Sequence, residues 1–97
     1  MYSYPFSVVI PIYNESLNII NLIEEILITL SKFKKFEVII IDDHSSDKSL
    51  EKINQKFNNN YLIKTFRNTK NLGQSLSIIK GCKLSKYETI VTLDGDG

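Results

Sequence analysis

The stretch FEVIIID, Phe36–Asp42, decides the fold class of this 97-residue chain. It is a nearly unbroken run of apolar, mostly β-branched residues that ends in an aspartate. Such runs are typical of strands in parallel sheets, which are covered on both faces. FSVVIPI (Phe6–Ile12) and TIVTLD (Thr89–Asp94) have the same character, whereas YLIKTF (Tyr61–Phe66) alternates between apolar and polar residues. The sequence therefore predicts four strands, with Tyr61–Phe66 at an edge of the sheet.

Between these strands, apolar residues recur at helical spacing, which predicts three amphipathic helices. The expected inward faces are Ile19, Ile23, Ile26, Leu27 and Leu30 in the first helix, Leu50, Ile53 and Phe57 in the second, and Leu76, Ile79 and Leu84 in the third. Asn14 or Ser16 is expected to cap the first helix. Gly81 lies inside the third, where glycine is unfavourable, so we expect that helix to approach a strand closely there.

The alternation of strands and helices predicts an α/β fold with an open parallel sheet, in the order βαβαβαβ and with right-handed crossovers. For a Rossmann-like nucleotide-binding half, the common strand order is 3-2-1-4. Ligands of such sheets bind beyond the carboxyl ends of the strands, at the point where the strand order reverses. That point is expected between the first and fourth strands.

Acidic residues gather where three of the predicted strands end, in PIYNE (Pro11–Glu15), DDHSSD (Asp42–Asp47) and DGDG (Asp94–Gly97). These acids are Glu15, Asp42, Asp43, Asp94 and Asp96. Carboxylates accept hydrogen bonds from base N–H groups and ribose hydroxyls, but they repel a diphosphate unless a cation lies between. Mg²⁺ and Mn²⁺ take oxygen ligands and commonly bridge carboxylates to phosphates. The sequence therefore predicts a site for a metal-bound nucleoside diphosphate.

The same carboxylates also have structural explanations. Asp94 and Asp96 could cap a turn after the last strand. Asp42 and Asp43 could belong to an N-cap cluster, because aspartate and serine favour that position. Glu15 could be favoured by the dipole of the first helix.

Three other residues have equally simple interpretations. Tyr13 could pack over the edge of the sheet. His44 is interpreted as a loop residue, since histidine is among the few non-glycine types tolerated at positive φ. Cys82 is expected to be a small residue of the core.

Four motifs in order, VVIPIYNE, VIIIDDHSSD, NTKNLGQSLSIIKG and VTLDGDG, resemble the signatures of family 2 glycosyltransferases of the GT-A type. They are most similar to those of the polyprenyl-phosphate sugar transferases, such as dolichyl-phosphate mannosyltransferase. The resemblance covers nearly the whole chain. It implies that residues 1–97 form the N-terminal, donor-binding part of the domain, ending just after the D-x-D motif, with the acceptor site and the catalytic base outside it.

The resemblance also implies roles for individual residues. Those expected to bind the nucleotide sugar are Pro11, Tyr13 and Glu15 in the first motif, Asp43 at the base with Ile41 beside it, and Asp94, Gly95 and Asp96 at the ribose and diphosphate. Mg²⁺ or Mn²⁺ would be held by the D-x-D aspartates, chiefly Asp96. No catalytic residue is implied within this stretch. His44 departs from the family pattern, which has glycine or asparagine at that position.

The resemblance implies an enzyme that transfers sugar from a UDP- or GDP-linked donor to an acceptor, such as a polyprenyl phosphate. The 97 residues alone are expected to be inactive. The alternative function is a nucleotide-binding or interaction module without catalysis. A receiver domain shares the strand–helix alternation, but its acidic pair follows the first strand, whereas here the pair follows the second.

The composition also bears on the class of protein, its binding partners and its cellular setting. The apolar share of 42%, the charged share of 24% and the net charge of +1 are ordinary for a globular domain and do not suggest nucleic-acid binding. A single cysteine fits a reducing, cytoplasmic setting. No run reaches the roughly 18 apolar residues of a membrane span, although full-length relatives are often membrane-associated. An exposed edge on the fourth strand predicts a homo-oligomer.

Overall fold

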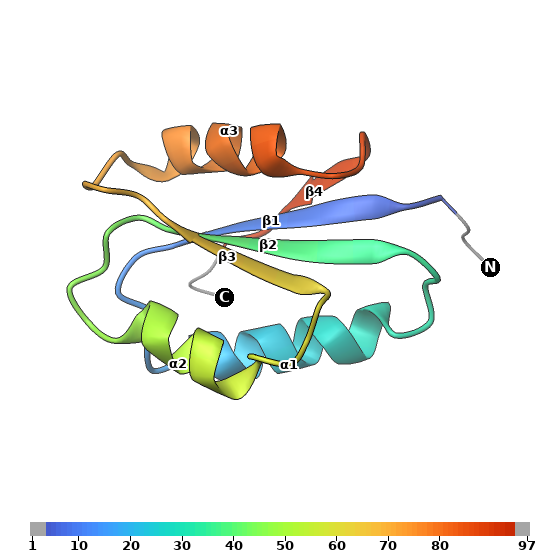
Figure 1. Cartoon of the computed structure of the whole chain (residues 1–97), viewed down its shortest axis with the longest axis horizontal. Helices are drawn as coiled ribbons and strands as arrows, with labels where there is room; N and C mark the ends of the chain where they lie inside the picture. Colours follow the sequence, from blue (N-terminus) through green and yellow to red (C-terminus); the bar gives the residue numbers. More distant parts are fainter. Residues whose placement is uncertain (1–3, 95–97) are drawn as a thin grey trace.

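The computed structural model describes residues 4–94, in which a parallel four-stranded sheet lies between two layers of helices (Figure 1). The strands are β1 (Phe6–Ile12), β2 (Phe36–Asp42), β3 (Ile63–Arg67) and β4 (Ile90–Thr92). The helices are α1 (Ile19–Leu30), α2 (Ser49–Lys56) and α3 (Gln74–Leu84). None of the helices in this range is long and apolar enough to cross a membrane. The strand order is β3-β2-β1-β4 with parallel neighbours, which confirms the predicted fold class and topology.

The two edge strands are shorter than predicted. β3 begins at Ile63 rather than Tyr61 because a turn precedes it, in which Asn60 accepts hydrogen bonds from the backbone N–H groups of Leu62 and Ile63. β4 covers residues 90–92, and the Leu93 N–H continues the pairing to the Val9 carbonyl at 3.1 Å. β4 is therefore a short strand, and it forms an outer edge of the described sheet.

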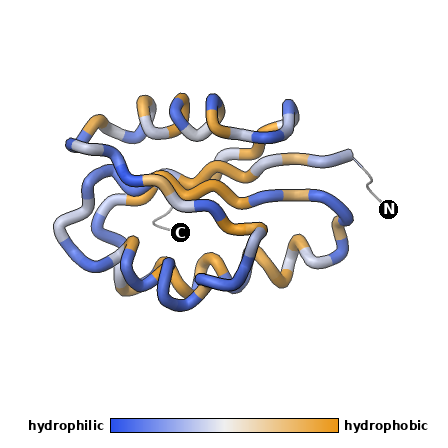
Figure 2. Tube along the Cα trace, viewed as in Figure 1, coloured by the Kyte–Doolittle hydropathy of each residue, from blue (hydrophilic) through white to orange (hydrophobic). Residues whose placement is uncertain are grey.

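The main core lies between the sheet and the layer formed by α1 and α2. Its buried side chains come from alternate strand positions and from the inner faces of both helices: Val8, Ile10, Ile12, Val38, Ile40, Ile19, Ile23, Ile26 and Ile53. Figure 2 shows this concentration of hydrophobic residues along the central strands and the lower helical layer. The inward faces predicted for α1 and α2 are confirmed, except that Leu50 is half-buried and does not pack against this core.

The face predicted for α3 is wrong. Leu76, Ile79 and Leu84 are 52%, 50% and 40% exposed, whereas Ser77 and Gly81 face the sheet. A Cβ atom at Gly81 would collide with Val9, so the small residues let the helix lie directly on β1 and β2. The expected close approach at Gly81 is thus confirmed. Cys82, expected in the core, is only half-buried, because α3 turns its other side to solvent.

Candidate functional site

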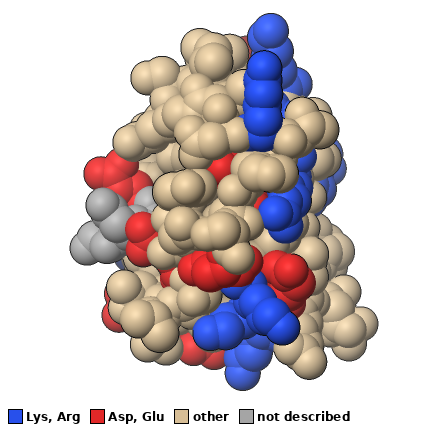
Figure 3. Space-filling view, turned by 90° about the vertical axis from the view of Figure 1, so that its left-hand side faces the viewer, with Lys and Arg blue, Asp and Glu red and all other residues tan. Residues whose placement is uncertain are grey.

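A polar pocket of about 230 Å³ opens at the carboxyl ends of the strands. It is lined by Pro11, Ile12, Tyr13, Glu15, Asp43, Gln74 and Asp94. Figure 3 looks onto this end of the sheet and shows acidic side chains across the face, with basic side chains along the right-hand side and below them. The pocket thus brings together residues from three strand ends, as the reversal of strand order between β1 and β4 leads one to expect.

Asp43 is the most buried acid of the pocket, with 4% of its surface exposed. Its Oδ1 accepts hydrogen bonds from Asn68 Nδ2 at 2.8 Å and from the Leu72 N–H at 2.7 Å, and its Oδ2 accepts one from the Gly73 N–H at 2.9 Å. Burial by itself raises the pKa of this carboxyl, but the hydrogen bonds from Leu72, Asn68 and Gly73 outweigh it and hold the pKa below its ordinary value. Asp43 is therefore ionised at neutral pH and fixes the loop that leads into α3.

Asn68 is the first residue of the motif NTKNLGQSLSIIKG, in which no role was predicted for it, and it supports Asp43 from within the protein. It is 1% exposed, and its Nδ2 group also lies 3.0 Å from Ser77 Oγ, which accepts a hydrogen bond. Its Oδ1 accepts a hydrogen bond from Lys80 Nζ at 3.0 Å. Hydrogen bonds therefore connect the ammonium group of Lys80 on α3, through Asn68, to the carboxylate of Asp43 in the pocket.

Hydrogen bonds join the loop after β1 to the loop after β2. Asn14 has a positive φ of 53°, and its Oδ1 accepts hydrogen bonds from the backbone N–H groups of Ser46 at 2.9 Å and Asp47 at 3.2 Å. The Asn14 N–H in turn donates to Ser45 Oγ at 2.9 Å. These contacts hold the two loops that border the pocket in one arrangement.

The first helix is not capped as predicted. Asn18 occupies the N-cap position of α1 and makes no side-chain capping hydrogen bond, so neither Asn14 nor Ser16 caps the helix. Instead the Ser16 N–H donates to Asp47 Oδ2 at 3.1 Å, while Asp47 Oδ1 accepts from the Ser49 N–H at 2.9 Å at the start of α2. Asp47 therefore connects the beginnings of both helices.

Asp42 turns away from the pocket. It is fully buried, and its carboxylate accepts hydrogen bonds from the Ser45 hydroxyl at 2.5 Å and the Ser45 N–H at 3.1 Å. It stabilises the turn after β2 rather than a helix terminus. In that turn His44 has a φ of 63°, the positive value that its glycine-like position implied, and its Nδ1 lies 3.2 Å from the Asn68 carbonyl oxygen.

Pro11, Tyr13 and Glu15 form the part of the pocket wall that follows β1. Pro11 is buried, while Tyr13 leaves 49% of its surface exposed. Glu15 precedes α1: its N–H donates to Ser49 Oγ at 2.9 Å, and its carbonyl accepts from the Ile19 N–H at 3.0 Å. All three residues expected from the first motif therefore reach the pocket.

Asp94 and Gln74 form another part of the wall, where the end of β4 meets the start of α3. Gln74 Nε2 donates a hydrogen bond to Asp94 Oδ1 at 2.9 Å. No role for Gln74 is predicted from the sequence, because a single polar residue at a helix start has no periodicity. The only signal was its position within the motif NTKNLGQSLSIIKG.

Among the described residues, Ile41 is the predicted site residue that does not line this pocket. It is fully buried with Val9 and Ile39 beneath α3. Gly95 and Asp96 lie outside the described residues. Their predicted roles in ligand binding therefore stay predictions.

The pocket has carboxylate oxygen atoms that could bind a hard cation, but the described residues do not form a complete metal-binding site. Within residues 4–94, no three His, Cys, Asp or Glu side chains are grouped closely enough to hold a metal ion. Asp43 already accepts three hydrogen bonds, whereas Asp94 is exposed and places its carboxylate on the pocket wall. Mg²⁺ is commonly held by one or two carboxylates together with substrate phosphates. The donor set fits a metal that binds with a diphosphate.

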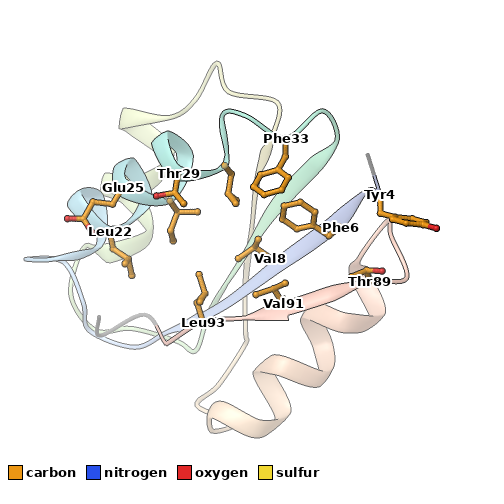
Figure 4. Close-up of a pocket in the computed structure, with 12 residues that line it drawn as sticks. Tyr4, Phe6, Val8, Leu22, Glu25, Thr29, Phe33, Thr89, Val91 and Leu93 are labelled. Carbon is orange, nitrogen blue, oxygen red and sulfur yellow. The ribbon is translucent and has the colours of Figure 1, made fainter. Parts of the chain in front are cut away.

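A larger concavity of about 560 Å³, here called the apolar groove, lies between α1 and the strands β1 and β4 (Figure 4). Its lining includes Phe6, Val8, Leu22, Val91 and Leu93. Among its lining residues, Glu25 alone carries a charge. A nucleotide needs several polar groups for orientation, so the smaller polar pocket is the better candidate for nucleotide binding.

Comparison with known protein families supports this assignment. The sequence model described as "Glycosyl transferase family 2" matches residues 7–97. The chain belongs to glycosyl transferase family 2. The family indicated by the four motifs is thus confirmed, over almost the full length of the chain.

Several curated relatives act on polyprenyl phosphates by name. The chain is 39% identical over 93 residues to the undecaprenyl-phosphate 4-deoxy-4-formamido-L-arabinose transferase of Photorhabdus laumondii, covering 93% of this chain and 28% of that protein. It is 36% identical over 90 residues to the dolichol-phosphate mannosyltransferase of Pyrococcus furiosus, covering 93% of this chain and 25% of that protein. The chain therefore spans only about a quarter of the length of these relatives.

Solved structures of glycosyltransferases share the fold. TarS of S. aureus, in complex with UDP-GlcNAc, has a TM-score of 0.83 and 27% identity, covering 95% of this chain and 26% of that one. The mannosyltransferase PcManGT of Pyrobaculum calidifontis, in complex with GDP-Man and Mn²⁺, has a TM-score of 0.86 and 21% identity, covering 99% and 28%. At 21% identity the second likeness shows the fold alone. Both confirm the GT-A type of fold expected from the resemblance.

Proposed function

We propose that this chain supplies the donor-binding part of an enzyme that transfers a sugar from a nucleoside-diphosphate sugar to an acceptor. The observation that carries this proposal is the polar pocket, where Pro11, Tyr13, Glu15, Asp43 and Asp94 meet at the carboxyl ends of the strands. The names of the relatives favour a polyprenyl phosphate as the acceptor. Either UDP or GDP fits the chemistry of the pocket.

Asp43 is proposed to recognise the base. A carboxylate has about four acceptor positions, and hydrogen bonds from Asn68, Leu72 and Gly73 take up three of them. A base N–H is proposed to donate to this carboxylate from the pocket side. The half-exposed ring of Tyr13, on the same pocket, offers a flat apolar surface beside it.

Asp94, together with Asp96, is proposed to hold Mg²⁺ or Mn²⁺ at the diphosphate. When bound, such a cation neutralises the charge that develops on the departing nucleoside diphosphate. Asp94 extends its carboxylate into the pocket from the end of β4, next to β1. The protein's part is to place these carboxylates within reach of the diphosphate while Asp43 holds the base.

Nucleotide binding tests the proposal. Calorimetric titration of the 97-residue chain with UDP and with GDP, in the presence of Mn²⁺, should give weak binding of one of them that becomes weaker, but still measurable, when the metal is chelated. Asp94→Ala and Asp96→Ala should each remove the metal dependence while leaving the thermal melting curve unchanged. Glu51→Ala, an exposed acid on α2 outside the pocket, is the matched control. Absence of binding at millimolar nucleotide, or binding indifferent to metal, would contradict the proposal.

The transfer reaction is proposed to need more polypeptide than these 97 residues, which form the donor side of the domain. The relatives that carry the activity by name are several times longer than this chain. We expect no turnover when the purified chain is incubated with a nucleotide sugar and a polyprenyl phosphate. Measurable product would show that the acceptor side is also present here. Metal-dependent nucleotide binding without turnover in a longer natural product would favour the alternative, a binding module.

The 97-residue chain is also proposed to self-associate. β4 lies at an edge of the described sheet, and its Val91 and Leu93 are 42% and 37% exposed beside the apolar groove. An exposed edge strand with apolar neighbours is a template for pairing with a second copy. Light scattering at tens of micromolar should show a dimer, and Val91→Lys should shift it toward monomer. A monodisperse wild-type monomer would refute this part of the proposal.

A further inference from the structure

Gln74 joins two parts of the pocket that are far apart in sequence. It is the first residue of α3, and its Nε2 donates a hydrogen bond at 2.9 Å to Oδ1 of Asp94, which follows β4. Both residues line the pocket and both are exposed to solvent. The contact is therefore available to any ligand that enters.

The position of Gln74 is set by Asp43. The residue before it, Gly73, has a φ of 93°, a conformation that side-chain-bearing residues rarely adopt. The N–H groups of Leu72 and Gly73 both donate to the carboxylate of Asp43, which locks this turn at the start of α3. A continuous series of contacts therefore runs from Asp43 through residues 72–74 to Asp94.

We infer that Gln74 positions Asp94 for the donor and couples it to the base-binding carboxylate of Asp43. This inference rests on the proposed function, in which Asp43 meets the base and Asp94 meets the ribose and diphosphate. With Oδ1 held by the amide of Gln74, the carboxylate of Asp94 has a defined orientation toward the ligand. Binding of the base at Asp43 then favours the orientation of the Asp94 carboxylate in which it contacts the donor.

The donor to Asp94 is a neutral side-chain amide, that of Gln74, and this affects how Asp94 interacts with a cation. A neutral N–H donor fixes the orientation of a carboxylate without cancelling its charge, so the attraction to a divalent cation is retained. A lysine or arginine at this place would compete with the cation. A glutamate would face Asp94 with a second negative charge, which only a bound cation could relieve.

A double-mutant cycle tests the inference, with calorimetric titration of Mn²⁺ and whichever of UDP or GDP the wild-type chain binds. Gln74→Ala should weaken nucleotide binding about fivefold, the loss expected for one partly exposed hydrogen bond to a charged group. In the Asp94→Ala background, the same substitution should have no further effect, because Gln74 acts through Asp94. Gln55→Ala, at an exposed glutamine of α2 outside the pocket, should bind like wild type.

Gln74→Glu gives a readout that a purely structural role would not change. The ratio of nucleotide affinity with Mn²⁺ to that without it should rise about tenfold over wild type, because the added carboxylate raises the need for a cation. Wild-type affinity in Gln74→Ala, or equal losses with and without Asp94, would overturn the inference and leave the proposed function standing. Failure of the wild-type chain to bind either nucleotide would instead refute the proposed function, and the inference with it.

Discussion

Replacement of Asp43 by alanine should weaken both the fold and the pocket, by an amount that follows from its contacts. The substitution removes the acceptor of three hydrogen bonds, from Asn68 Nδ2 and the N–H groups of Leu72 and Gly73. Leu72 and Gly73 are half-buried, so water can replace part of what they lose. Asn68 Nδ2 is buried and keeps only Ser77 as an acceptor.

Each lost bond to an ionised acceptor is worth about 1.5–3 kcal/mol where water cannot enter, and less where it can. For one buried and two partly hydrated donors, we expect a loss of about 2–3 kcal/mol in the free energy of unfolding. A small domain has about 5–15 kcal/mol in total, so the variant should still fold. The start of α3 should nevertheless be released from the pocket.

Urea unfolding at pH 7, followed by circular dichroism, measures this loss. With an m value of about 1–1.5 kcal/mol per molar urea, the midpoint should fall by about 2 M at an unchanged m value. Asp43→Asn keeps the shape and one acceptor oxygen, so it should lose roughly half as much. A midpoint for Asp43→Ala within about 0.3 M of wild type would show that these hydrogen bonds do not hold the loop.

Three further predictions concern other parts of the structure. Gly81→Ala should destabilise the chain by about 1–3 kcal/mol, because its Cβ collides with Val9, and thermal melting will show whether it does. Asn14→Ala should be less stable than Asn14→Gly in urea, since the alanine loses the hydrogen bonds and keeps the strained φ of 53°. Burial alone would raise the pKa of Glu37, but hydrogen bonds from Lys64, Ser7 and Lys86 hold this pKa below its ordinary value. The ionised Glu37 therefore stabilises the folded state above the ordinary pKa, and this stabilisation is lost as the pH falls through the folded pKa. Glu37→Gln should therefore be less stable than wild type at pH 7 and lose less stability below about pH 4, as acid-titration melts would show.

The position of the site could be predicted because strand ends are visible in the sequence. The runs that end at Ile12 and Asp42 are continuous and apolar, so the residues that follow them had to lie at one rim of a parallel sheet. The roles within the rim could not be assigned as reliably. Asp42 and Asp43 are adjacent, yet their alternating directions send one into a turn and the other into the pocket.

The wrong or missing predictions concern residues whose burial depends on close contact between elements. Leu76 and Ile79 have the periodicity of a buried face, but α3 presents Ser77 and Gly81 instead, because only small residues let it lie this near β1. Asn68 follows an edge strand, which placed it outside the predicted rim. It reaches the site because the chain turns back after β3 to begin α3.

The central position of β1 has a consequence for the order in which the protein is made. One side of β1 pairs with β2, about 30 residues later in the chain. The other side pairs with β4, which is synthesised much later: the hydrogen bond from the Tyr87 N–H to Ser7 Oγ spans 80 residues. At a synthesis rate of about 5–20 residues per second, that interval is on the order of 4–16 s. During this time a nascent chain carries β1 with one edge unpaired and open to other polypeptides. The loops that hold Asp43 and Asn14 can form before then, so the pocket is completed only when β4 and the Asp94 that follows it leave the ribosome.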